Sequence, residues 1–73
     1  MNTARAREHL MQAERYVVEG QRHIAEQRAK IENAKRAGLD TTANRILLST
    51  FEDSQALLVA ELERLRAEIH ETN

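Results

Sequence analysis

The chain has 73 residues, enough for one small domain, so we expect a single domain over residues 1–73. It contains no cysteine, which excludes disulfides and thiolate metal sites as sources of stability. Strong helix formers dominate, and only Tyr16 and Phe51 are aromatic, so the composition predicts an all-α protein. No apolar run approaches the roughly 18 residues of a membrane span, and the first residues are too charged for a secretory signal. We therefore expect a cytoplasmic protein that does not act on membranes.

The formal net charge of −1 conceals opposite charges in the two halves of the chain. Residues 1–37 carry eight Lys or Arg against five Glu, which gives +3, and residues 38–73 carry three Arg against seven acidic residues, which gives −4. Opposite charges favour packing the halves side by side and disfavour packing like halves together. The alternative is that both charge sets are simply solvated faces, since an exposed pair contributes only about 0–1 kcal/mol.

The first half of the chain predicts a helix over about residues 3–37. Large residues recur every seven positions at Leu10, Val17, Ile24 and Ile31, and a small or polar residue follows each after three positions: Ala13, Gly20, Gln27 and Ala34. This is a heptad pattern with large and small residues alternating. Gly20 would cost about 1 kcal/mol in an exposed helix interior, so we expect it to allow close approach across the contact line, with a hinge as the alternative.

The stretch RAGLDTT at residues 36–42 interrupts this helix, and we expect a turn at 38–40. Gly38 can adopt the left-handed conformation that ends a helix. Asp40 or Thr41 can cap a second helix, and Leu39 is expected to point inward and close the apolar end of the hairpin. An uninterrupted helix of about 70 residues is the competing interpretation.

The second half predicts a helix over about residues 41–71, and the two helices form an antiparallel hairpin. Its two heptad rows are Leu48, Gln55, Leu62 and Ile69, and Phe51, Leu58 and Leu65. Folding back at the turn is expected to place Leu58 opposite Gly20 or Gln21, Leu65 opposite Ala13 or Glu14, and Phe51 near Gln27 or Arg28. We call the expected contact line the seam, and it comprises Leu10, Val17, Gly20, Ile24, Ile31, Leu48, Phe51, Leu58, Leu62, Leu65 and Ile69.

More apolar residues are present than one seam can bury. Met11, Val18 and Ala25 broaden the apolar face of the first helix, and Ile46, Leu47, Leu57 and Val59 broaden that of the second. Two helices sharing one contact line enclose no core, so we expect the seam and these flanking residues to support self-association. The expected assembly is a homodimer, an antiparallel four-helix bundle of two hairpins, with the relative orientation of the hairpins left open.

Three stretches of the chain carry a further signal: AERYVVEGQRHI at 13–24, GLDT at 38–41 and LLSTFEDSQAL at 47–57. Over roughly residues 9–65 the chain resembles a group of short, uncharacterised helical proteins common in alphaproteobacteria. The resemblance implies a helical hairpin from a soluble bacterial protein and implies no established activity. Members of that group often carry histidine where this chain has Tyr16 and Leu58, which argues against a mechanism that needs a histidine cluster.

Neither a metal nor a catalytic site is expected. His9, Tyr16 and His23 form one stripe at intervals of seven residues, but neighbours two helical turns apart lie about 10.5 Å apart along the axis, too far to share a metal ion. The chain offers no cysteine nucleophile, no glycine-rich phosphate loop and no Ser/His/acid arrangement. We therefore expect a non-enzymatic protein without cofactors, and a pH-sensitive interface at His9 and His23 remains an alternative.

The sequence is most consistent with a protein–protein interaction module or small regulator. The alternative is RNA or DNA binding by a basic ridge on the first helix, and a helical-hairpin dimer that binds paired RNA loops offers a fold-level analogy. Interleaved glutamates, a pI of about 6.3 and few aromatic residues speak against that alternative. Gln27 and Gln55 are expected either to fix register and orientation as buried or half-buried amides or to point to water from the seam edge. The basic ridge comprises Arg15, Arg22, Arg28, Lys35 and Arg36.

Overall fold

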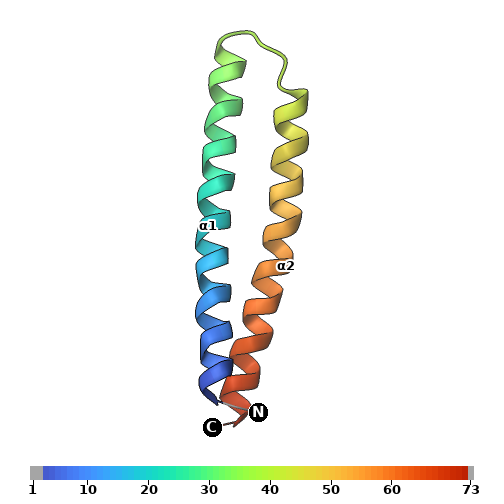
Figure 1. Ribbon diagram of the computed structural model, residues 1–73. Coiled ribbons are helices and arrows are strands. Elements are labelled where there is room, and N and C mark those ends of the chain that lie inside the picture. Colours follow the sequence, from blue (N-terminus) through green and yellow to red (C-terminus); the bar gives the residue numbers. More distant parts are fainter. Residues whose placement is uncertain (1–2, 73) are drawn as a thin grey trace.

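The structure, a computed structural model that describes residues 3–72, consists of two long antiparallel helices (Figure 1). Helix α1 spans Thr3–Arg36, helix α2 spans Thr42–Thr72, and residues 37–41 connect them. The start of α1 and the end of α2 lie together at the end opposite the connection, and the molecule measures 55 × 14 × 13 Å. The helical hairpin is confirmed with bounds within one residue of those expected, and the uninterrupted helix is wrong. Neither helix contains a stretch both long enough and apolar enough to cross a bilayer.

All eleven seam residues are buried or half-buried against the opposite helix. Ala13, Val17, Leu62 and Leu65 form the buried cluster, which agrees with the expectation that Leu65 lies opposite Ala13 or Glu14. The partly buried side chains that pack against this cluster are Leu10, Leu58 and Val59. Because the seam residues of one chain are covered by its own two helices, a second copy of the chain would have to contact residues outside the seam.

The seam extends one heptad further at each helix start than we expected. Ala6 is 6% exposed and Thr41 is 8% exposed. Ala6 precedes Ala13 by seven residues, and Thr41 precedes Leu48 by seven. The heptad period therefore predicts that both residues lie on the seam.

Helix α1 ends in a Schellman motif. Gly38 has a φ of 72°, its N–H donates to Lys35 O at 3.0 Å, and the Leu39 N–H donates to Ala34 O at 2.9 Å. These two bonds satisfy carbonyls that the last helical turn would otherwise leave unpaired. Lys35 and Arg36 occupy that turn, where a positive charge is favourable at the negative end of the helix dipole.

The expectation that Leu39 points inward is wrong, because its side chain is 64% exposed. The left-handed residue Gly38 reverses the chain so that Leu39 faces solvent. Thr41, which continues the heptad row of α2, closes this end of the seam instead.

Helix α2 begins with a cap that two residues share. The Asp40 carboxylate accepts hydrogen bonds through Oδ1 from the Thr42 hydroxyl at 2.7 Å and the Thr42 N–H at 3.0 Å. The Thr41 carbonyl accepts from Arg45 N–H at 2.9 Å, which starts the helical ladder. The hydrogen bonds from the Thr42 side chain and backbone lower the pKa of the Asp40 carboxyl below its usual value.

Replacing Gly38 with valine should destabilise the hairpin by roughly 1–2 kcal/mol, because a β-branched residue is strained at positive φ. A Cβ at this position would meet nothing within 4 Å, so the cost comes from the backbone and not from a clash. Gly38→Asn is the matched control and should cost less, because asparagine tolerates the left-handed region. Urea unfolding at one fixed protein concentration measures both, and equal stability of Gly38→Val and the native chain would contradict the turn.

Replacing Asp40 with alanine should destabilise the protein at about pH 6 and have progressively less effect in acid. The pKa of Asp40 is lower in the folded chain than its usual 3.8, so its stabilising contribution is complete above 3.8 and is lost as the pH falls through the folded value. Thermal unfolding across this range measures the difference between the two proteins. A difference that stays constant into acid would show that the carboxylate does not act as the cap.

Candidate functional site

A continuous groove runs along one side of the seam, and three adjoining cavities form it. The central cavity, of about 290 Å³, is lined by Tyr16, Glu19, Gly20, His23, Phe51, Ser54, Gln55 and Leu58. A second cavity shares Tyr16 and Leu58 with it and reaches His9, Glu61 and Leu65. A third shares His23 and Phe51 and reaches Lys30 and Leu47. We call this surface the aromatic groove.

The histidine stripe expected from the sequence lines this groove. The His23 ring packs against Phe51 with 5.8 Å between ring centroids and 55° between ring planes. Phe51 was expected nearer Gln27 or Arg28; Gln27 lines the third cavity with Phe51, but the ring contact is made by His23. No cluster of three His, Asp or Glu side chains suited to a metal ion occurs within residues 3–72.

Gly20 allows a close approach across the seam, but the side chain that approaches is not the expected one. A Cβ at Gly20 would lie 1.9 Å from Gln55 Oε1. The end of the Gln55 side chain lies directly over Gly20, and Leu58, expected opposite Gly20 or Gln21, lines the same cavity as Gly20. Glycine at this position leaves room for the end of the Gln55 side chain, which agrees with the packing interpretation and not with the hinge.

The two seam glutamines connect the helices in opposite directions. Gln55 Nε2 on α2 donates to the Val17 carbonyl on α1 at 2.8 Å, and Gln27 Nε2 on α1 donates to the Asn44 carbonyl on α2 at 3.2 Å. Gln27 is only 4% exposed. Gln27 is thus a buried amide and Gln55 a half-buried one, and neither points to water from the edge of the seam. Gln55 Oε1 is buried on the floor of the aromatic groove and has no hydrogen-bond partner among the described residues.

The opposite side of the seam is more charged. Arg28 on α1 pairs with Glu52 on α2 at 3.1 Å, and Lys35 pairs with Glu32 at 3.9 Å. These pairs are exposed and each contributes about 0–1 kcal/mol. A cavity near the turn on this side is lined by Arg28, Ile31, Glu32, Lys35, Arg45 and Leu48.

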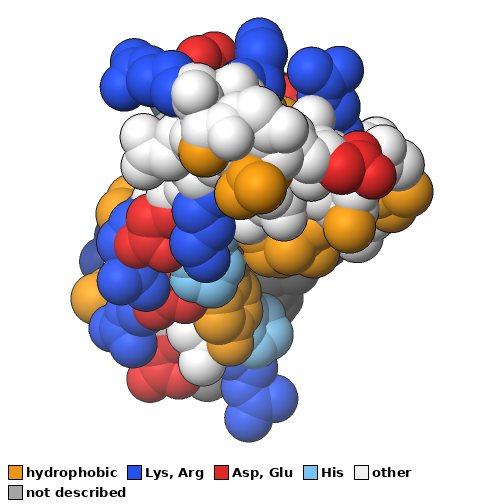
Figure 2. Space-filling model, turned by 90° about the horizontal axis from the view of Figure 1, so that it is seen from above, with side chains coloured by type: hydrophobic (Ala, Val, Ile, Leu, Met, Phe, Trp, Pro, Cys, Tyr) orange, Lys and Arg blue, Asp and Glu red, His pale blue; other side chains and the backbone are white. Residues whose placement is uncertain are grey.

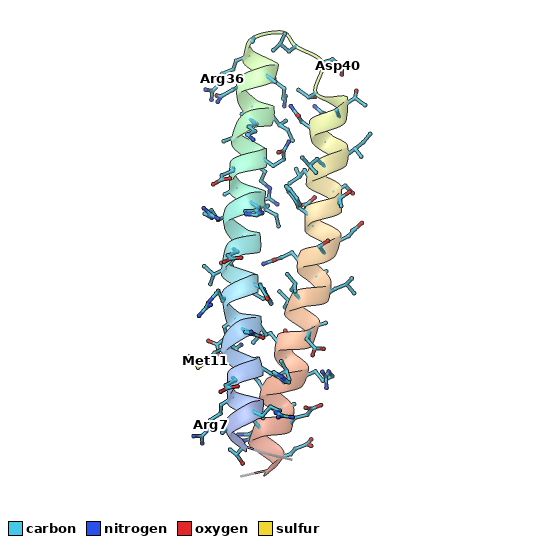
Figure 3. The ribbon with its side chains drawn as sticks, viewed as in Figure 1. Arg7, Met11, Arg36 and Asp40 are labelled. Atoms are coloured by element: carbon cyan, nitrogen blue, oxygen red, sulfur yellow. The ribbon has the colours of Figure 1, made fainter. Side chains whose placement is uncertain are left out.

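The basic ridge is divided by these ion pairs. Arg28 and Lys35 each have a carboxylate partner, whereas Arg15, Arg22 and Arg36 form no side-chain hydrogen bond or ion pair within the described part of the chain. Arg36 points away from α2 (Figure 3). The ridge thus offers three free cations on a helix face where glutamates also lie.

Large hydrophobic side chains are widely exposed on the hairpin. Seen from the turn end, hydrophobic side chains reach the surface on more than one side (Figure 2). Met11 points away from α2 (Figure 3). Within residues 3–72, no large side chain is fully buried. The exposed set, with exposed fractions, is Met11 63%, Tyr16 50%, Val18 62%, Leu39 64%, Ile46 64%, Leu47 43% and Leu57 74%.

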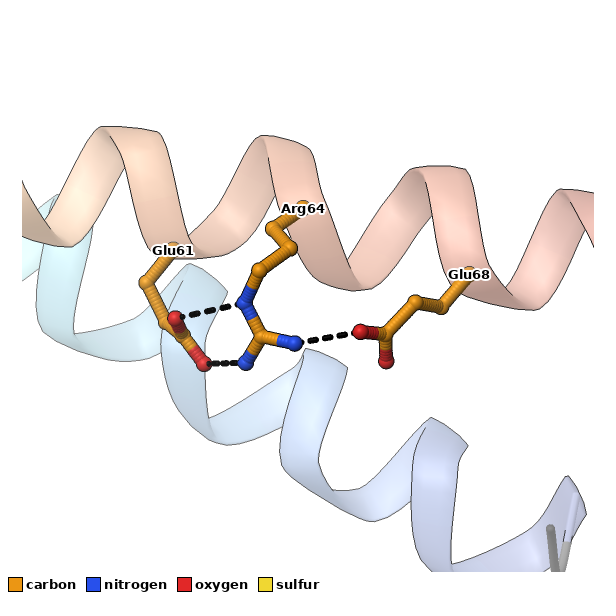
Figure 4. Close-up of polar contacts among 3 residues, drawn as sticks. All are labelled: Glu61, Arg64 and Glu68. Carbon is orange, nitrogen blue, oxygen red and sulfur yellow. Dashed lines mark hydrogen bonds and ion pairs between the residues drawn. The ribbon is translucent and has the colours of Figure 1, made fainter.

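A three-residue ionic network that sequence reasoning missed lies near the end of α2. Arg64 pairs with Glu61 and with Glu68 on successive turns (Figure 4). The hydrogen bond from Arg64 lowers the pKa of Glu61, and that same bond raises the pKa of Arg64. The sequence could have indicated this network, because Glu61 and Glu68 lie three and four residues from Arg64, the spacings at which side chains meet on a helix. The network fixes Glu61, which lines the aromatic groove.

No protein-family model matches the chain, and no curated protein or solved structure is significantly similar to it. The resemblance to short alphaproteobacterial helical proteins therefore stays a prediction.

The contact between Gly20 and Gln55 predicts a strong coupling between two substitutions. Gly20→Ala should stabilise α1 by about 1 kcal/mol, because alanine has a higher helix propensity than glycine. In the native chain the new methyl group also displaces the Gln55 side chain and breaks its hydrogen bond to the Val17 carbonyl, which contributes about 0.5–1.5 kcal/mol to stability. We expect almost no net effect in the native chain and stabilisation by about 1 kcal/mol in a Gln55→Ala background. Equal effects of Gly20→Ala in both backgrounds, measured by urea unfolding, would contradict the contact.

Proposed function

We propose that the protein is a homodimeric helical interaction module in which two hairpins form a four-helix bundle that presents helical surfaces to a protein partner. The observation that carries the proposal is the set of seven large hydrophobic side chains that are 43–74% exposed on a hairpin with no fully buried large side chain in its described residues. Two of the seven, Tyr16 and Leu47, line adjoining cavities of the aromatic groove, and apolar surface gathered around a groove marks interaction sites on proteins.

The energetics of a two-helix molecule support the same proposal. The buried hydrophobic residues are Ala6, Ala13, Val17, Ile31, Leu62 and Leu65, so two of the six are alanines that bury little area. A chain of this length usually needs disulfides, a metal or oligomerisation to supplement its core. With no cysteine in the chain, association remains available. Each large side chain that a second copy covers completely would add about 1.5–3 kcal/mol.

Nucleic-acid binding is supported less well. Two of the five cations of the basic ridge are ion-paired, and the other three share their helix with Glu8, Glu19 and Glu26. Binding driven by phosphate contacts needs a concentration of free positive charge. The expected absence of catalytic activity and of cofactors, and the expected cytoplasmic location, stay predictions.

Sedimentation equilibrium at micromolar concentration should give twice the chain mass of 8.4 kDa. Circular dichroism on the same samples controls for folding and should show high helix content. Thermal stability should also rise with protein concentration, because association stabilises only the folded chain. A folded monomer whose stability does not depend on concentration would refute the proposal.

An electrophoretic assay with RNA and DNA tests the alternative, and we expect no shift at physiological salt. A shift that weakens with salt and disappears in the triple variant Arg15→Gln, Arg22→Gln, Arg36→Gln would instead support the basic ridge as a nucleic-acid surface. Arg5→Gln with Arg66→Gln, which removes positive charge outside the ridge, is the control for a general charge effect.

A further inference from the structure

The aromatic groove is less charged than the cavity on the opposite side of the seam, where four of the six lining residues carry a charge. Its rim carries Tyr16, which is 50% exposed, and Leu47, which is 43% exposed. Leu57, which is 74% exposed, lies beside the rim, because it is three residues from Ser54 and four from Glu61, and both of these line the groove. Val18 follows Tyr16 by two residues, about 200° around α1, so it faces away from the groove. On the opposite side of the seam, Arg28, Glu52 and other charged residues flank the contact line.

We propose that a second copy of the chain occupies the aromatic groove, an inference that rests on the proposed function. Both turns lie at the same end of the bundle. In this arrangement α1 of each copy packs against α2 of the other. The groove of one copy then faces the groove of its partner. The occupant is thus a surface of the same shape, as a two-fold symmetric interface requires.

Shape favours this arrangement. Gly20 and Gln55 are in contact, so they lie at the same level along the hairpin, and Leu57 is only two residues further along α2. When the turns lie together, the same level in the partner carries its own Leu57. Leu57 of the partner subunit therefore meets the central cavity between Tyr16 and His23. An exposed leucine thus fills the cavity that the hairpin alone leaves open.

Charge selects between the two possible symmetric arrangements. Helix α1 carries eight Lys or Arg against five Glu, a net +3, and α2 carries three Arg against six acidic residues, a net −3. If the turns lie together, α1 faces the partner's α2 and opposite charges meet. If they lie at opposite ends, α1 faces α1 and α2 faces α2, so like charges meet. Packed helices lie about 8–10 Å apart, close to the Debye length of about 8 Å at physiological salt, so this difference is felt across the interface.

The test of orientation is a distance between spin labels, and the chain suits it because it has no native cysteine. Arg36→Cys places a label beside the turn on an exposed residue outside the groove. We expect a label separation in the dimer below about 30 Å, whereas turns at opposite ends would place the labels about 45 Å or more apart for helices of this length. Arg22→Cys, near the middle of α1, is the matched control, because it reports a short separation in either arrangement.

The test of the face uses two exposed aliphatic residues of similar exposure. Leu57→Glu, beside the groove, should raise the dimer dissociation constant by about tenfold or more, whereas Val18→Glu, at a residue that is 62% exposed and faces away from the groove, should change it by less than about threefold. Circular dichroism confirms that both variants remain helical. Tyr16→Glu is the second groove variant and should weaken the dimer in the same way.

The outcomes separate this inference from the proposal on which it rests. A long Arg36 separation with a short Arg22 separation would overturn the orientation and leave the dimer intact. Weakening by Val18→Glu and not by Leu57→Glu or Tyr16→Glu would overturn the choice of face. Absence of a measurable separation with either label, together with a monomer mass, would overturn the dimer itself.

Discussion

The seam between α1 and α2, which we also call the strip of contacting side chains, supplies the tertiary contacts within residues 3–72. The rest of the structure depends on it. With only two described elements, each residue either lies on this strip or faces outward. The strip holds mainly aliphatic side chains interleaved with Ala6, Ala13 and Gly20, which lets two long helices lie close without a third layer. Because two helices share a single contact line, Met11, Val18 and Leu57 cannot be buried inside the hairpin.

Polar groups give the strip its specificity. Purely apolar contacts along two long helices would tolerate a shift of one helical turn, because the next heptad residue is chemically similar. Gln55 and Gln27 oppose such a shift, because each amide bonds a particular carbonyl on the other helix. Gly20 is the counterpart of this arrangement, since no other residue leaves room for the Gln55 amide. The Schellman turn at Gly38 and the cap from Asp40 add a fixed chain reversal at one end.

The surface follows from what the strip cannot bury. On the aromatic groove side, Tyr16, Leu47 and Leu57 remain accessible around a cavity, while ion pairs such as Arg28–Glu52 flank the other side. Opposite net charges on the two helices distinguish the possible partners of each helix. Association of two copies would use both features, since apolar burial supplies the free energy and charge selects the orientation.

The sequence by itself determined the helices, the turn and the rows of the seam. Each of these follows from local chemistry: a heptad period over Leu10 to Ile31, glycine at a left-handed residue, and an aspartate two residues before the N–H that it caps. Even the two missed buried residues, Ala6 and Thr41, extend rows that were already visible.

Only the tertiary structure decided which side chains meet across the seam and which way the turn residues face. It placed Gln55 and not Leu58 over Gly20, set the ring of Phe51 against His23, and turned Leu39 outward while burying Thr41. A sequence period fixes the face on which a residue lies but not its level along the opposite helix. That level is set by the geometry of the connection and by the fit of long side chains against small ones, and both exist only once the two helices are packed together.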